Sequence, residues 1–268
     1  MNNTFGFIGT GNMGGALARA AAKAMQAQDI LLSDGYAPVA QALAKELGCE
    51  AVTVDTVATK AGFVWLGVKP QVIGSVLSGI APILAARTDD FVLVSMAAGV
   101  TIADIRRMAG GDYPVIRIMP NIPVSAGSGV ILYDATDNVP QEAVAVFREN
   151  MRFAGLVDPL PEHLIDAGSA LSGCGPAFVS LFIEALADGA VTCGLPRKQA
   201  LAYAAQTLAG TAKMILDSGI HPGALKDAVC SPGGSTIVGV QALEQGAFRA
   251  SAMEAVIAAY HKTRELGK

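Results

Sequence analysis

The chain has 268 residues, of which 52 % are hydrophobic and only 16 % charged, and its formal net charge is −4. This length is enough for one large domain or two ordinary ones with a buried core. The lack of Lys- or Arg-rich runs argues against nucleic acid or an anionic membrane as a partner. The apolar excess favours an oligomer.

The sequence also argues against a membrane span, an export signal and a metal site. The longest charge-free stretches, 70–86 and 167–183, contain Gly, Ser and Pro, and fall short of the roughly 18–20 apolar residues that a spanning helix needs. Residues 1–4 carry no basic region of the kind that opens a signal peptide. The four cysteines form no CxxC motif or Cys/His cluster. We therefore expect no metal, no disulfide framework and a cytoplasmic location.

The first half of the chain alternates short apolar runs, which predict strands, with helical patterns. The expected strands are residues 4–8, 30–33, 63–67, 91–95, 115–119, 130–133 and 156–157. The first expected helix ends near residue 27, and the others cover 39–47, 70–84, 102–108 and 141–150. Gly48 is the expected cap of the second helix, and Pro82 is expected to break the end of the third. Continuous apolar strands between helices predict a parallel sheet covered on both faces, with the last two strands at its edge.

After about residue 158 the strand-like runs stop, and long Ala- and Leu-rich helical patterns follow. Proline just inside the first turn marks several expected helix starts, since it lacks an N–H that would be unpaired there. These prolines are Pro176, Pro196, Pro222 and Pro232. The helices are apolar around much of their circumference, as expected if they pack against a second subunit.

Three glycines, Gly9, Gly11 and Gly14, form a G-x-G-x-x-G pattern between the first strand and the first helix. In this context the pattern is typical of a dinucleotide-binding loop. Gly9 allows the tight turn, Gly11 lets a pyrophosphate approach the backbone, and Gly14 lets the helix pack closely on the strand. The expected fold class is α/β. Residues 1–158 would form an N-terminal Rossmann-type doubly wound sheet, and residues 159–268 a C-terminal all-helical domain for substrate binding and dimerisation.

The end of the second strand bears on the choice between NADH and NADPH. Asp34 lies twenty residues after Gly14, where an acidic side chain hydrogen-bonds the ribose 2′-hydroxyl of NAD. No Arg follows in the next two positions, as an NADP site would normally have. Ser33 could still contact a 2′-phosphate, and Lys60 or Arg19 could fold toward it. Both cofactors stay open, and Asp34 predicts that NADH is accepted at least as well as NADPH.

Two glycine-bearing loops precede helices in the second half, at residues 171–176 and 231–236. Free N–H groups and hydroxyls at a helix start suit a small anion such as a carboxylate, although both loops could be plain capped connections. Neither neighbourhood holds a carboxylic acid: none lies between Asp227 and Glu244, or between Asp166 and Glu184. Hydride delivery to a protonated imine needs no strong base, whereas oxidation of an alcohol does.

Several motifs together resemble the pyrroline-5-carboxylate reductase family over essentially the whole chain. They lie at residues 9–14, 68–70, 95–101, 117–121, 172–176, 221–227 and, most specifically, 231–236. The resemblance implies reduction of pyrroline-5-carboxylate to L-proline by NADPH or NADH, in a homodimer that sometimes assembles into a decamer. It also implies that Thr236 hydrogen-bonds the ring nitrogen as the catalytic residue, and that Glu162 contacts the substrate.

The resemblance and the glycine loop together give the expected site residues. The substrate contacts are Glu162, Ser231, Gly233, Gly234, Ser235 and Thr236. The cofactor contacts are Gly9, Thr10, Gly11, Asn12, Met13, Ser33, Asp34, Val68, Lys69, Pro70, Met96, Ala97, Ala98, Met119 and Asn121. Three positions depart from the family pattern, namely Cys174, Asp34 with its neighbours, and Ala228.

Two other classes of protein compete with this interpretation. A β-hydroxyacid dehydrogenase shares the glycine loop but carries a catalytic Lys on the first long helix of its second domain. Residues 177–191 contain no Lys or Arg, which argues against it. A non-catalytic nucleotide-binding scaffold would bind the cofactor without turnover and would have no need of the loop at 231–236.

Overall fold

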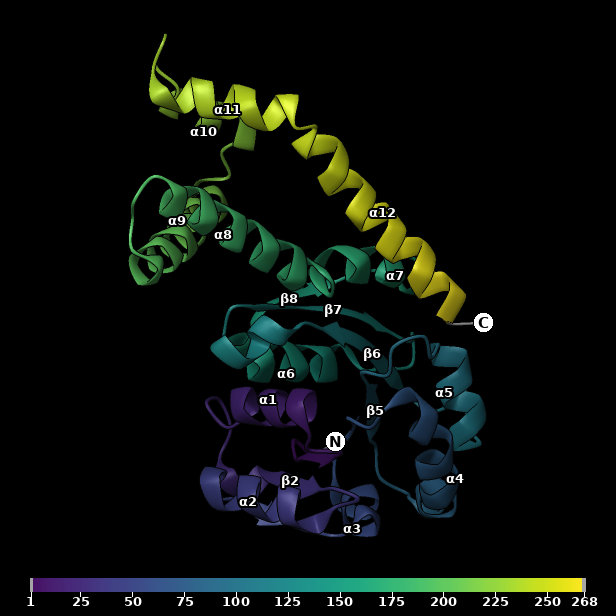
Figure 1. Ribbon diagram of the computed structural model, residues 1–268. Coiled ribbons are helices and arrows are strands. Elements are labelled where there is room, and N and C mark those ends of the chain that lie inside the picture. The colour runs from purple at the N-terminus through teal and green to yellow at the C-terminus, as the bar shows by residue number, and fades with distance from the viewer. Residues whose placement is uncertain (1, 267–268) are drawn as a thin grey trace. The chain divides into compact units, whose positions relative to one another are not determined.

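The computed structural model describes residues 2–266 and divides into two compact units (Figure 1). One unit runs to Gly173 and also includes the chain from Tyr260 onward, while the other comprises Cys174–Ala259. The last strand ends at Pro159, close to the domain boundary expected after residue 158. The compact units divide further along the chain, after Gly173, and the boundary after residue 158 stays a prediction.

The first unit is built on one eight-stranded sheet whose strand order is β3-β2-β1-β4-β5-β6-β7-β8. The strands are β1 (Phe5–Ile8), β2 (Ile30–Ser33), β3 (Glu50–Ala51), β4 (Phe63–Leu66), β5 (Val92–Ser95), β6 (Val115–Pro120), β7 (Gly129–Ala135) and β8 (Gly155–Pro159). The order reverses direction at β1, with β4 beside it, so the sheet is doubly wound as predicted.

One strand departs from the expected parallel arrangement. β7 runs antiparallel to β6, because only the 3₁₀ turn Ile122–Ala126 and its flanks join them, and a parallel crossover needs a dozen or more residues. β7 also pairs with β8, so it lies inside the sheet, and of the two expected edge strands only β8 is at the edge. The two-residue strand β3 was not predicted.

Helices cover both faces of the sheet, which confirms the doubly covered arrangement. They are α1 (Asn12–Ala21), α2 (Ala37–Leu47), α3 (Val54–Lys60), α4 (Pro70–Ala86), α5 (Ile102–Ala109), α6 (Gln141–Met151) and α7 (Glu162–Ser172). The core on one face centres on Trp65, with Phe7 and Phe147 against its ring. The core on the other face contains Leu66 and Leu77. Alternate residues of one strand thus serve opposite cores.

Local signals explain several helix boundaries. Gly48 adopts the left-handed conformation as the cap of α2, as predicted. Pro82 does not end α4: the helix continues to Ala86, and burial of Ile80 and Leu84 in the core holds its last turns. The first helix ends at Ala21 rather than near residue 27.

The second unit is helical. Its elements are α8 (Gly175–Thr192), α9 (Arg197–Ser218), α10 (Pro222–Val229), α11 (Ser235–Gln245) and the first part of α12 (Phe248–Leu266). Two of the four prolines expected in first turns are there, in α8 and α10. Pro196 is instead the residue before α9, and Pro232 lies in the turn that precedes α11.

This helical unit lacks a core of its own. Within Cys174–Ala259, all of which the structure describes, the buried hydrophobic residues are Ala187, Ala200 and Ala204. The stretch Glu162–Thr192, which comprises α7 and α8, is by length and composition apolar enough to cross a membrane, contrary to the sequence expectation. Only 11 % of its most apolar window is buried within the chain, so most of this surface is open to a partner.

Candidate active site

The glycine loop joins β1 to α1 with very close backbone contacts. Gly9 has a positive φ of +96°, and its N–H donates to the carbonyl of Ser33 at 2.8 Å. A Cβ on Gly14 would lie 2.1 Å from the carbonyl oxygen of Gly9, so only glycine allows the helix to start here. A Cβ on Gly11 would meet nothing within 4 Å. These environments are the ones that the pattern predicts for its three glycines.

A fourth glycine belongs to this constellation, and sequence reasoning missed it. Gly67 follows β4, the neighbour of β1, and a Cβ there would lie 2.5 Å from the carbonyl oxygen of Gly9. Conversely, a Cβ on Gly9 would lie 2.6 Å from the carbonyl carbon of Gly67. The available signal was a glycine at the end of the continuous apolar run 63–67.

The start of α1 fits the pyrophosphate of a dinucleotide. Its N-cap is Gly11, and no side chain caps the helix. Gly11 and Asn12 are exposed, so the first amide groups of the helix point to an open surface. Unpaired N–H groups and the positive end of the helix dipole bind phosphate oxygens. The residues present are therefore suited to a dinucleotide cofactor.

Asp34 follows β2 and is tied to the glycine loop. Its Oδ2 accepts hydrogen bonds from the Thr10 N–H at 2.7 Å and the Thr10 hydroxyl at 3.2 Å, and its Oδ1 accepts one from the Tyr36 N–H. Ser33 is 2 % exposed, which does not favour contact with a 2′-phosphate.

Of the two cations that could fold toward a 2′-phosphate, Arg19 is held by another side chain. Arg19 forms a bidentate ion pair with Glu46, at 2.6 and 2.7 Å, which lowers the pKa of the Glu46 carboxyl. Lys60 is the last residue of α3. Among residues 2–266, neither side chain forms a hydrogen bond or an ion pair with Asp34, whose partners are Thr10 and Tyr36. An arginine that clamps a 2′-phosphate is thus not in evidence among the described residues.

The loops after β4 and β5 lie at the same edge of the sheet, since the two strands are parallel neighbours. Val68 is partly buried, Lys69 is the exposed N-cap of α4, and Pro70 is its first residue. The loop after β5 begins with Met96, Ala97 and Ala98. Of these three residues, Met96 is half-buried, Ala97 is buried and Ala98 is exposed.

The residues expected at the nicotinamide end have other contacts as well. Met119 is 8 % exposed and packs with Leu132 and Ile165, which lies on α7. The Asn121 Nδ2 donates to the carbonyl of Ser172 at 2.9 Å, and its Oδ1 accepts from a β7 amide. Both residues therefore join the sheet to α7, and their contact with the cofactor stays a prediction.

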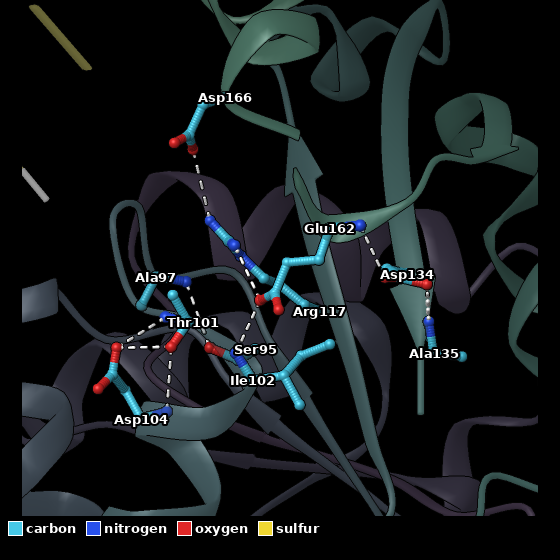
Figure 2. Close-up of polar contacts among 10 residues, drawn as sticks. All are labelled: Ser95, Ala97, Thr101, Ile102, Asp104, Arg117, Asp134, Ala135, Glu162 and Asp166. Atoms are coloured by element: carbon cyan, nitrogen blue, oxygen red, sulfur yellow. Dashed lines mark hydrogen bonds and ion pairs between the residues drawn. The ribbon is translucent and has the colours of Figure 1, made fainter. Parts of the chain in front are cut away.

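A buried arginine forms the centre of a polar cluster between β6 and α7 (Figure 2). Arg117 is 4 % exposed, and its Nη1 donates to Glu162 Oε1 at 2.9 Å. The same oxygen accepts from the Ile102 N–H at 2.7 Å, and the Glu162 N–H donates to Asp134. Sequence reasoning included Arg117 in a motif without a role. These bonds do not test whether Glu162 contacts the substrate, and that contact stays a prediction.

The loop at residues 231–236 belongs to the helical unit. Gly233 has a φ of +67°, and the Gly234 N–H closes a turn on the carbonyl of Ser231 at 3.0 Å. Gly234 is the N-cap of α11, and no side chain caps that helix. Ser235 and Thr236 form its exposed first turn. The loop thus offers uncapped amides and two hydroxyls at the start of an eleven-residue helix.

The fold and the glycine loop define a class of protein: an oxidoreductase that uses a nicotinamide dinucleotide. Residues 4–99 match the family model "NADP oxidoreductase coenzyme F420-dependent". Residues 162–266 match the model "Pyrroline-5-carboxylate reductase dimerisation".

Full-length relatives narrow the class to one family. The chain is 40 % identical over 270 residues to pyrroline-5-carboxylate reductase of Methanosarcina acetivorans, covering 100 % of this chain and 99 % of the relative. It is 39 % identical to the Escherichia coli enzyme of that name, with both chains covered completely. A solved pyrroline-5-carboxylate reductase from Coxiella burnetii superposes with a TM-score of 0.93 at 30 % identity over both whole chains. The Plasmodium falciparum enzyme with NADP bound gives 0.85 at 31 % identity, over 99 % of this chain and 98 % of that one. The chain belongs to the pyrroline-5-carboxylate reductase family.

Proposed function

We propose that the chain reduces L-1-pyrroline-5-carboxylate to L-proline with NADPH or NADH, the last step of proline biosynthesis. The observation that carries this proposal is the uncapped start of α11 at residues 231–236, with no carboxylic acid between Asp227 and Glu244. Amides and hydroxyls without an acid or a base suit a substrate that carries its own carboxylate and a protonated C=N bond.

On the cofactor side, the uncapped amides of α1 would hold the pyrophosphate, and the loops after β2, β4, β5 and β6 would line the rest. The proposed contacts are Gly9, Thr10, Gly11, Asn12, Met13, Ser33, Asp34, Val68, Lys69, Pro70, Met96, Ala97, Ala98, Met119 and Asn121. When bound, the reduced nicotinamide supplies the hydride for the imine carbon.

On the substrate side, the α11 start would hold the carboxylate through the amides of Gly233, Ser235 and Thr236, while the Gly234 N–H closes the turn on the Ser231 carbonyl. The Thr236 hydroxyl would hydrogen-bond the ring nitrogen and fix the plane of the C=N bond. Orientation and a hydrogen bond formed at the reacting nitrogen are the contributions that such a site can make.

A direct assay tests the proposal against the competing oxidation of an alcohol. We expect NADPH or NADH absorbance to fall when pyrroline-5-carboxylate is added, and no reduction of NAD⁺ or NADP⁺ with 3-hydroxy acids. Turnover of a 3-hydroxy acid in place of the imine would contradict the proposal. Cofactor binding without turnover of either substrate would indicate the non-catalytic scaffold.

The position of Asp34 predicts that the enzyme uses NADH at least as well as NADPH. A 2′-phosphate beside this carboxylate is repelled, and Asp34→Asn removes the charge. We expect the substitution to raise the NADPH-to-NADH ratio of kcat/KM about tenfold, since a unit charge at close range near a surface is worth at least 1.4 kcal/mol. Steady-state kinetics with both cofactors measure the ratio. A wild-type kcat/KM for NADPH that greatly exceeds the value for NADH would contradict the interpretation of Asp34.

The helical unit is proposed to form the homodimer. A groove of about 430 Å³ in this unit is lined almost wholly by apolar side chains of α8 and α12. Its residues are Phe178, Val179, Leu181, Phe182, Ala185, Phe248, Ser251, Ala252 and Ala255. This surface belongs to the segment that matches the dimerisation model. The helical unit buries only three alanines among its hydrophobic residues within Cys174–Ala259, which is too little for a core of its own. Assembly into a decamer and a cytoplasmic location are further parts of the proposal.

A charge in the groove is predicted to dissociate the oligomer. Leu181 is 68 % exposed in the single chain, so Leu181→Asp costs little there but buries a carboxylate in the assembled protein. We expect light scattering after gel filtration to show a shift from the oligomer to the monomer. Val39→Asp, at another exposed apolar position but on α2, is the control and should keep the wild-type mass. A Leu181→Asp variant that stays oligomeric would place the interface elsewhere.

A further inference from the structure

The loop between β5 and α5 is weakly bonded along its length. Residues 96–101 carry three of the predicted cofactor contacts. The hydrogen bonds donated by residues 96, 97 and 100 are long: Met96 N to Leu66 O at 3.4 Å, Ala97 N to Ser95 Oγ at 3.4 Å, and Val100 N to Ala97 O at 3.3 Å. Protein N–H···O bonds usually span 2.7–3.2 Å. The loop's conformation therefore depends on how its two ends are held.

The far end of the loop is held by short bonds to side chains. Thr101 and Asp104 form a reciprocal capping box at the start of α5, which keeps the pKa of the Asp104 carboxyl below its usual range. The next amide, Ile102 N–H, is one of the donors that a helix start leaves unpaired. Glu162 Oε1 accepts it at 2.7 Å across 60 residues of sequence. A side chain of α7 therefore fixes the end of a cofactor loop.

The position of that carboxylate is in turn set by Arg117 (Figure 2). The guanidinium is 4 % exposed and lies 2.9 Å from Glu162 Oε1, with Asp166 more distant at 3.7 Å. The Arg117 Nε has no hydrogen-bond partner among the described residues. If Glu162 swung away toward solvent, a buried guanidinium would lose its nearer counter-ion, which is strongly unfavourable.

We propose that Arg117 and Glu162 are positioning residues for the cofactor. Glu162 acts through Ile102 on the loop 96–101, and Arg117 keeps Glu162 in place. This assigns to Glu162 a different role from a substrate contact: its Oε1 already accepts two short hydrogen bonds within the nucleotide-binding unit. The inference rests on the proposed function only in that the loop faces a nicotinamide cofactor.

The first test compares Glu162→Ala with Glu162→Gln. Alanine removes the acceptor, so the binding-competent loop is less populated, and we expect the Kd for NADPH to rise about tenfold if a tenth of the molecules stay competent. Glutamine keeps a carbonyl oxygen for both donors but loses the charge that pairs with Arg117, so its Kd should lie between those of wild type and Glu162→Ala. His163→Gln is the matched control, since His163 is exposed beside Glu162 on α7 and, among the described residues, bonds neither to α5 nor to Arg117. Cofactor fluorescence gives the Kd.

Amide hydrogen exchange and substrate kinetics supply independent readouts. Without cofactor, residues 96–102 should exchange faster in Glu162→Ala than in His163→Gln, while the sheet strands keep wild-type protection. The KM for pyrroline-5-carboxylate at saturating cofactor should stay within about twofold. A raised KM for the imine with an unchanged Kd for NADPH would overturn the proposal and make Glu162 a substrate contact.

A backbone substitution tests the same bond without touching the ion pair. Ile102→Pro removes the N–H that Glu162 accepts; proline suits the first position of a helix, and Thr101 already has the extended conformation that proline requires before it. Ile102→Ala loses the same apolar side chain but keeps the N–H. We expect NADPH to bind several-fold more weakly to Ile102→Pro than to Ile102→Ala. Equal affinities would overturn the proposal.

All of these binding measurements are made without the imine substrate. Failure of the proposed reaction would therefore be seen separately, as wild-type protein that binds NADPH but does not turn over pyrroline-5-carboxylate.

Discussion

Gly14→Ala is expected to lower the Tm and to abolish measurable binding of NADPH and NADH. Its new Cβ would lie 2.1 Å from the carbonyl oxygen of Gly9, a backbone atom held by the sheet through the Gly9–Ser33 hydrogen bond. Gly67 closes the other side of Gly9, so the loop has no room to retreat. Overpacking of this kind costs about 1–3 kcal/mol of stability and displaces the start of α1. Calorimetric unfolding and cofactor fluorescence measure the two effects.

Gly11→Ala separates binding from folding in the same loop. No protein atom lies within 4 Å of a Cβ at Gly11, so the variant should keep the wild-type Tm. The methyl group would instead occupy the surface where the pyrophosphate is expected, raising the Kd for NADPH about tenfold or more. Gly79→Ala, equally unobstructed but in α4, is the control and should bind normally. Normal NADPH binding by Gly11→Ala would show that the phosphates lie elsewhere.

Thr236→Ala is expected to lower kcat/KM for pyrroline-5-carboxylate by about 100-fold, or about 2.7 kcal/mol. This is the size of effect seen when one hydrogen bond made in the transition state is lost. Thr236 lies in the exposed first turn of α11. Its hydroxyl forms no hydrogen bond within residues 2–266 and is therefore available to a ligand. The Kd for NADH should stay nearly unchanged.

Thr236→Ser is the matched variant for this prediction. It keeps the hydroxyl and loses only a methyl group, so most of the wild-type kcat/KM should return. A circular dichroism spectrum equal to that of wild type would show that α11 is intact in both variants. Equal losses in cofactor affinity and in kcat/KM for Thr236→Ala would mean that the residue serves the cofactor rather than the imine.

Several strands, helix ends and the contact of Gly14 with Gly9 were predictable because their causes are local. The apolar run Ile30–Ser33 is a strand with the expected bounds, and Gly48 caps α2 through its own left-handed backbone. His221, the N-cap of α10, accepts a hydrogen bond from the Gly223 N–H two residues further on. Each of these outcomes depends on a few neighbouring residues.

The features that could not be predicted depend on contacts between distant segments. Alternation along β6 puts Arg117, Met119 and Asn121 on one face, but it does not say which helix covers that face. The structure places α7 there, and its Glu162 and Ser172 take up the two polar side chains. The direction of β7 and the continuation of α4 through Pro82 are likewise decided by connection length and core burial.

The central claim, hydride transfer to a cyclic imine, is tested most directly by isotope transfer. Wild-type protein is mixed with pyrroline-5-carboxylate and NADPH, or NADH, that carries deuterium at both C4 positions, and the product is analysed by mass spectrometry and NMR. We expect L-proline with one deuterium on the former imine carbon. The account would be contradicted if the imine were recovered unreacted with both cofactors, or if the proline formed carried no deuterium.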